Sequence, residues 1–200
     1  MRRRLFAVLV GCLSVLAIAG PALADTVPGP GNFRDSGSSL YAYAFASECG
    51  PATCTETNVY ASITTLRGGD TFSSVCFDQY TYQLRGGGGG GFLSGCSEDV
   101  TVDIADDLSS ASVDATVLAE ECGRHSCSSD EVSVSAELFA VSAPSGYSYT
   151  QKNQFENCTD SYRVRGEASD AEGSIVVDGT TLGAYGQIGD ETFAFSTRCR

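Results

Sequence analysis

The sequence predicts an all-β protein, an antiparallel β-sandwich or barrel-like fold built from an internal duplication and held by four disulfides. Two observations carry this prediction. Apolar and polar residues alternate along many short segments, which is the period of strands with one buried face. A six-residue turn with a cysteine at each end, CGPATC at Cys49–Cys54, returns as CGRHSC at Cys122–Cys127, and each copy leads into an alternating run.

The expected strands follow one another along the chain, separated by clusters of Gly, Asp and Ser. Helical periodicity is scarce, and its best candidate, Ala115–Glu121, is preceded by alternation. We therefore expect about ten short strands. The eleven candidate segments are Tyr41–Cys49, from Val59 onward, Phe72–Leu84, Val100–Ile104, Ala115–Cys122, from Val132 onward, Tyr147–Phe155, Tyr162–Ala168, Ser174–Asp178, Leu182–Ile188 and Thr192–Cys199.

Ordered landmarks indicate the duplication. The shift between the two cysteine-flanked turns is 73 residues, and the pattern C-x-D-x-Y at Cys76–Tyr80 recurs at Cys158–Tyr162. Self-similarity of this kind is typical of a repeated unit. We expect a first β repeat with a leading strand over residues 25–121 and a second over residues 122–200. They form one pseudo-symmetric domain or two small tandem domains.

Eight of the nine cysteines follow residue 24, and an even set in an exported chain is typical of disulfides in an oxidising compartment. Symmetry and proximity favour the pairs Cys49–Cys54, Cys76–Cys96, Cys122–Cys127 and Cys158–Cys199. The second repeat has no cysteine at the place of Cys96. Zinc ligation is the competing interpretation, because the spacing within each turn fits the wide end of ligand spacing. A single histidine in the chain disfavours it.

The first 24 residues have the form of a secretory signal peptide. Three arginines at positions 2–4 precede an apolar stretch, Leu5–Ala19, and an A-x-A site ends at Ala24. We expect cleavage after Ala24 and a secreted, extracellular protein with no membrane span. The alternatives are a membrane anchor, for which the apolar stretch is short, and lipidation of Cys12 in a lipobox-like sequence.

The composition restricts the partners. After residue 24 the chain has nine basic and 25 acidic residues, a net charge of −16. Nucleic acid and anionic lipid are poor partners for such a chain, because both require neutralising cations. The acidity also favours solubility in an extracellular medium. We expect an extracellular protein or glycan as the partner.

Paired carboxylates are the first candidates for chemistry. Asp78 and Asp160 recur in the C-x-D-x-Y pattern. A glycosidase needs two carboxyl groups on one site about 5–9 Å apart. The competing interpretation is structural, because such aspartates often accept backbone N–H bonds near turns.

Other candidates have weaker signals. His125 lies in the second cysteine-flanked turn and has Ala52 as its counterpart, which favours an ordinary turn residue over a catalytic base. The run Gly86–Gly91 lacks the lysine and the spacing of a phosphate-binding loop, and indicates a loop between two strands. Calcium could bind carboxylates near Asp103, Asp106 and Asp107, but an EF-hand pattern is absent.

The sequence thus predicts a binding, structural or interaction module with no catalytic residues, no cofactor and no metal. Tyr41, Tyr43 and Tyr60 could form an aromatic binding face, or they could pack in the core. One alternative is an extracellular hydrolase that uses Asp78 and Asp160. Another is a small secreted inhibitor or toxin that presents the loop Ser142–Lys152.

Overall fold

The computed structural model describes residues 33–84, 90–122, 127–155 and 157–199. It confirms the all-β antiparallel fold, and those ranges contain no helix. Ten strands follow in order: β1 (Phe33–Cys49), β2 (Thr53–Leu66), β3 (Thr71–Gln83), β4 (Gly91–Ser97), β5 (Val100–Ile104), β6 (Ser110–Cys122), β7 (Cys127–Ala140), β8 (Ser145–Phe155), β9 (Cys158–Val177) and β10 (Thr180–Cys199).

The strands form one ten-stranded sheet in the order β10-β1-β2-β3-β4-β6-β7-β9-β8, and β5 pairs with β6. Strand β9 is long enough to have two partners on one edge. Its first half pairs with β8 and its second half with β7. Its other edge pairs with β10 along its whole length. The series of pairings that begins at β10 therefore returns to β10.

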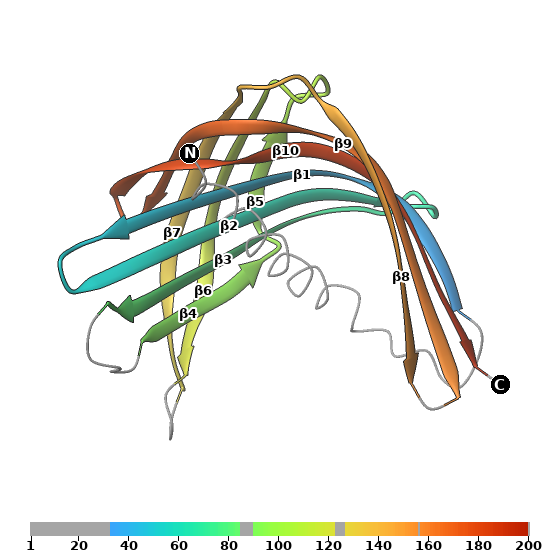
Figure 1. Cartoon of the computed structure of the whole chain (residues 1–200), viewed down its shortest axis with the longest axis horizontal. Helices are drawn as coiled ribbons and strands as arrows, with labels where there is room; N and C mark the ends of the chain where they lie inside the picture. Colours follow the sequence, from blue (N-terminus) through green and yellow to red (C-terminus); the bar gives the residue numbers. More distant parts are fainter. Residues whose placement is uncertain (1–32, 85–89, 123–126, 156, 200) are drawn as a thin grey trace.

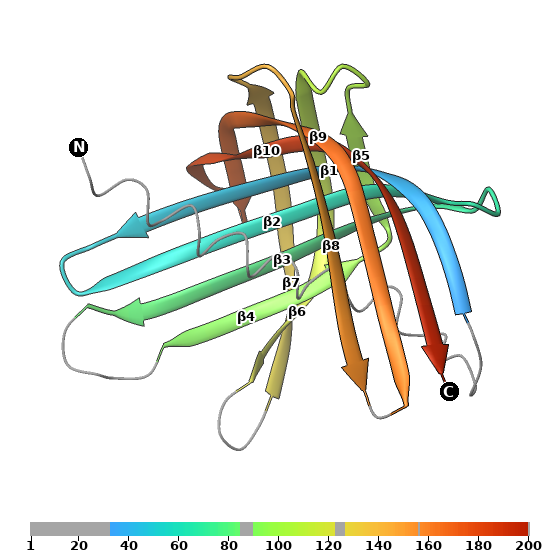
Figure 2. The same ribbon diagram turned by 45° about the vertical axis from the view of Figure 1, so that its right-hand side comes forward.

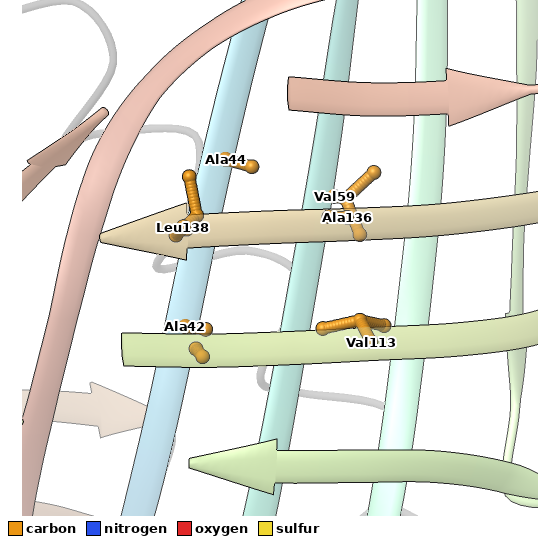
Figure 3. Close-up of a pocket in the computed structure, with 7 residues that line it drawn as sticks. Ala42, Ala44, Val59, Val113, Ala136 and Leu138 are labelled. Carbon is orange, nitrogen blue, oxygen red and sulfur yellow. The ribbon is translucent and has the colours of Figure 1, made fainter. Parts of the chain in front are cut away.

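The sheet folds back on itself, so that β1, β2 and β3 cross in front of β6 and β7 (Figure 1). The apolar core lies at this crossing. Figure 3 shows its centre, formed by Ala42, Ala44 and Val59 together with Val113, Ala136 and Leu138. Alanine recurs through the core, and these small side chains let the two layers approach closely. The space between them holds no volume that a water molecule could fill.

The turn between β9 and β10 shows how local sequence sets the register. Val177 and Thr180 are paired, so Asp178 and Gly179 form a two-residue hairpin turn. Both have positive φ, 48° and 80°, as the turn type preferred by Asp-Gly requires. Asp178 also joins the hairpin to β7, because its carboxylate accepts the Ser133 N–H at 2.9 Å.

Three of the expected disulfides are present: Cys49–Cys54, Cys76–Cys96 and Cys158–Cys199. Each joins directly opposite residues of neighbouring strands. The fourth expected bridge, Cys122–Cys127, includes a side chain outside the described part of the chain. Several disulfides fit an oxidising, extracellular environment.

The ten strands agree with the expected number of about ten, but their bounds and lengths differ from the expectation. Tyr162–Ala168 and Ser174–Asp178 were expected as separate strands, but β9 runs through both regions with 20 residues. Strand β10 likewise unites the last two expected strands. The prediction of a loop over Ser142–Lys152 is wrong from Ser145 onward, because the residues from Ser145 belong to β8 and pair with β9. Strand β4 was not expected, since its Gly and Ser content masks its alternation.

The described ranges do not include the expected signal peptide at residues 1–24, nor His125, nor most of the Gly86–Gly91 run. The proposed boundary between repeats at residue 122 also stays a prediction. Within the described ranges, no helix has the length and apolar character needed to cross a membrane.

Candidate binding surface

The five strands β10, β1, β2, β3 and β4 have two different faces. Side chains alternate between them, so one face packs in the core through residues such as Ala44, Val59 and Phe77. The opposite face, called here the outer face, carries a row of mutually opposite residues from β10 to β4: Tyr185, Phe45, Asn58, Asp78 and Ser94.

Aromatic side chains stand at both ends of this row. Phe45 and Tyr185 lie 5.2 Å apart between ring centroids at one end. Tyr80 and Tyr82 are stacked at 5.6 Å at the other end, and Phe92 lies opposite Tyr80. Tyr185, Phe92 and Tyr80 are 57%, 50% and 44% exposed, which is unusual for large rings that could have been buried.

Polar side chains fill the space between the aromatic ends. The Tyr43 hydroxyl donates to Asn58 Oδ1 at 2.6 Å, and Asn58 Nδ2 donates to Asp78 Oδ1 at 3.5 Å. Burial raises the pKa of Asp78, and the hydrogen bond from Asn58 partly opposes this effect. The chain of hydrogen bonds holds Asn58 in one orientation, with Asp78 beside it.

A second carboxylate lies on the same face. Glu56 is opposite Tyr80, and its Oε1 accepts the Tyr82 hydroxyl at 3.1 Å. This hydrogen bond is the main cause that raises the pKa of Tyr82. Glu56 and Asp78 are diagonal neighbours on β2 and β3, a relation that corresponds to about 7 Å.

The outer face continues past this row into a tyrosine cluster. Tyr41 and Tyr60 are stacked at 6.2 Å, and the Tyr41 ring lies over Gly189, where a Cβ would be 2.6 Å from Tyr41 Cζ. Glycine at position 189 is therefore required for this packing. Tyr147 reaches the same cluster from β8 and donates to Glu191 Oε2 at 3.1 Å. Burial raises the pKa of Tyr60 above its ordinary range.

Glu191 is partly buried in this tyrosine cluster, and its burial makes stability depend on pH. Its pKa is raised mainly by burial, with repulsion by Asp190 as a lesser cause, against the opposing hydrogen bond from Tyr147. A carboxyl with a raised folded-state pKa stabilises the fold below its unfolded pKa, and this contribution is lost as the pH rises through the folded pKa.

Replacing Glu191 by Gln keeps an oxygen acceptor for Tyr147 and removes the charge. We expect Glu191→Gln to raise Tm by roughly 2 °C at pH 7 and to leave it unchanged at about pH 3, where both forms are neutral. Thermal unfolding followed by circular dichroism at the two pH values measures this. A lower Tm of the variant at pH 7 would contradict the assignment of the charge as destabilising.

The structure does not bring Asp78 and Asp160 together. Asp78 lies in the row of Phe45, whereas Asp160 lies in the row of Phe33 and accepts the Thr197 hydroxyl at 2.8 Å. The two rows cross β1 at Phe33 and at Phe45. These two residues are twelve positions apart, which corresponds to about 40 Å of extended strand. A glycosidase pair requires about 5–9 Å. The neighbour of Asp78 is Glu56.

The other candidates lie away from the outer face. Asp103 is the fourth residue of β5, and Asp107 accepts the backbone N–H of Ser109 at 3.0 Å in the following turn. The pKa of Asp107 is lowered mainly by a hydrogen bond with the Ser109 side chain, and also by this backbone hydrogen bond. In the part of the chain that the structure describes, no group of three or more His, Cys, Asp or Glu is arranged to hold a metal ion.

Comparison with protein-family models, with curated proteins and with solved structures finds no match to this chain. The sequence did point to Tyr41, Tyr43 and Tyr60, which do share the outer face. It missed Glu56 and Phe92. The sequence of β3 contained one sign of this face. Phe77 lies on one side of the strand and Tyr80 and Tyr82 lie on the other, so aromatic residues occupy both faces of β3.

Proposed function

We propose that this protein is an extracellular binding module whose outer face binds a glycan. The observation that carries the proposal is the pair of exposed aromatic groups on either side of Asn58, Asp78 and Glu56. The C–H faces of a sugar ring pack on aromatic rings, while its hydroxyls pair with amide and carboxylate groups. Rigid aromatic side chains supply such contact area at low conformational cost.

The dimensions of the outer face support a chain of sugars over a single one. Phe45 and Tyr80 lie two strands and two residues apart, a separation of about 12 Å. This separation favours an extended ligand that lies across the strands. The three disulfides support the extracellular location, because they need an oxidising compartment.

The single-alanine variants Tyr80→Ala, Phe92→Ala and Tyr185→Ala test the proposal. Each is expected to lower affinity for a bound oligosaccharide about tenfold, the effect of about 1.4 kcal/mol, with little change in Tm. Phe139→Ala is the matched control, because Phe139 is 59% exposed on β7, away from the outer face. A glycan panel with isothermal titration of the hits measures this. Equal losses in the control, or no hit in the panel, would contradict the proposal.

A second candidate function is glycan hydrolysis, and the proximity of Asp78 and Glu56 favours it. Asp78, with its raised pKa, would act as the acid, and Glu56 as the base. Asp78→Asn decides between the two functions. A hydrolase loses turnover in this variant. A binding module shows no turnover in either form and still binds, because the amide of asparagine also pairs with sugar hydroxyls.

We also infer a barrel-like, duplicated form for the sheet. The series of pairings from β10 back to β10 supports closure over an open sandwich. The backbone register supports the duplication, because Cys49 lies opposite Cys54 and Cys122 opposite Cys127. Both cysteine-flanked turns thus connect neighbouring antiparallel strands.

A further inference from the structure

The cations of this acidic chain are concentrated in one place. The whole chain has a formal net charge of −13, and its described ranges contain six lysine and arginine residues. Five of them line a single groove of about 540 Å³: Arg34, Arg67, Lys152, Arg163 and Arg198. The sixth is Arg165, which lies outside the groove.

Most residues that line the groove belong to β8, the first half of β9, the end of β10 and the start of β1. These strand segments run side by side, away from β6 and β7 (Figures 1 and 2). Lys152, Ser161, Ser196 and Arg34 are opposite one another across these four strands. The separation of Lys152 from Arg34 is therefore three strand spacings, about 14 Å.

Alternation explains why cations occur on this side. The pairing of β1 with β10 has no break, so Arg34 and Ser36 share a face of β1 with the core residues Ala42 and Ala44. The core face thus continues into the groove. Over this part of the sheet no second layer of described strands covers that face (Figure 2), and polar, charged residues replace the apolar ones.

The five cations have no ionic partner within the part of the chain that the structure describes. Among the described residues, Asp35 has the one carboxylate that lines the groove, and this carboxylate accepts the backbone N–H of Ser36 at 2.7 Å. Hydroxyl groups lie between the cations, from Ser36, Ser161 and Ser196. A groove with five cations and with hydroxyl donors, on a chain that is acidic as a whole, is complementary to an anion.

We propose that this groove is a second binding site, separate from the outer face, which takes a short oligosaccharide that carries carboxylate or sulfate groups. Arginine binds such planar or tetrahedral anions through paired N–H donors, and four of the five cations are arginines. The size of the groove is that of a site for a small ligand. A long polyanion such as nucleic acid would extend beyond the groove, where the net negative charge of the chain repels it.

Isothermal titration with four probes of equal length tests this site: hexagalacturonate for carboxylate, a sulfated maltohexaose for sulfate, neutral maltohexaose, and a six-residue oligothymidylate for nucleic acid. At least one of the two anionic sugars is expected to bind tenfold or more tightly than maltohexaose. That binding weakens as salt is added, because exposed charges are screened. The anionic sugar that binds more tightly shows whether the groove prefers carboxylate or sulfate groups.

The triple variant Arg34→Gln/Arg163→Gln/Arg198→Gln is expected to lower this affinity about tenfold or more, from three exposed charge contacts. Arg165→Gln is the matched control, because Arg165 is on the same strand and face as Arg163 but outside the groove. It should change the affinity less than twofold. The proposal would be overturned if the control lost as much affinity as the triple variant. It would also be overturned if the oligothymidylate bound more tightly than both anionic sugars, or if maltohexaose bound as tightly as they do.

Discussion

Phe77→Ala is expected to lower the free energy of unfolding by about 3–5 kcal/mol, the range for truncating a buried phenylalanine. Phe77 is 1% exposed and belongs to the core cluster. The core cluster to which it belongs consists largely of alanine and valine, whose short side chains fill little of a new cavity. A loss of this size is a large fraction of the 5–15 kcal/mol that stabilises a typical domain. Urea unfolding followed by circular dichroism measures it.

Phe92→Ala is the matched comparison, because it removes the same side chain from the neighbouring strand. Phe92 is 50% exposed on the outer face, so its loss should cost less than about 1 kcal/mol. The two variants therefore distinguish the core face from the outer face. Phe77→Ala is expected to unfold easily, whereas Phe92→Ala is expected to fold normally and to bind the glycan poorly. Similar unfolding energies for both would contradict the assignment of the core and outer faces.

Removal of the Cys158–Cys199 bridge is the second large effect. The two cysteines are 41 residues apart, against five for Cys49–Cys54. Chain-entropy estimates give about 4 kcal/mol for the longer loop and about 2 kcal/mol for the shorter one. We expect the double variant Cys158→Ala/Cys199→Ala to be less stable than Cys49→Ala/Cys54→Ala by about 2 kcal/mol.

Urea unfolding of the two double variants measures this difference, with mass spectrometry to confirm that the other bridges stay closed. The short bridge sits at a hairpin turn, where it mainly holds the register of β1 and β2. An equal or larger loss from the short bridge would show that register, and not loop closure, governs the stability of this sheet.

Period-two alternation was sufficient to predict the all-β fold and most of the strands. It placed Val100–Ile104 as the structure has it, and the C-x4-C spacing predicted a bridged hairpin at Cys49–Cys54. Alternation is a local property, because each strand exposes it in its own sequence. It could not show that β9 and β10 pass through their glycine-containing segments without a break.

The two proposed binding surfaces depend on the register between strands, which local sequence patterns do not contain. Glu56 becomes the neighbour of Asp78 only through the pairing of β2 with β3. The cationic groove requires Arg34, Lys152 and Arg163 to meet from three strands distant in sequence. In the sequence these cations are scattered through an acidic chain. Net charge therefore predicted only that nucleic acid and anionic lipid are poor partners, and it gave no sign of a local cationic groove.

The central claim is that the outer face, and not the core or the opposite layer, contacts the ligand. The most direct measurement is a titration of the aromatic side-chain signals by NMR with an oligosaccharide hit from the glycan panel. We predict shifts at Tyr80, Phe92 and Tyr185, with the buried Phe77 and the distant Phe139 unchanged. Shifts confined to Phe139, or none at the three outer-face rings while binding is saturated, would contradict the claim.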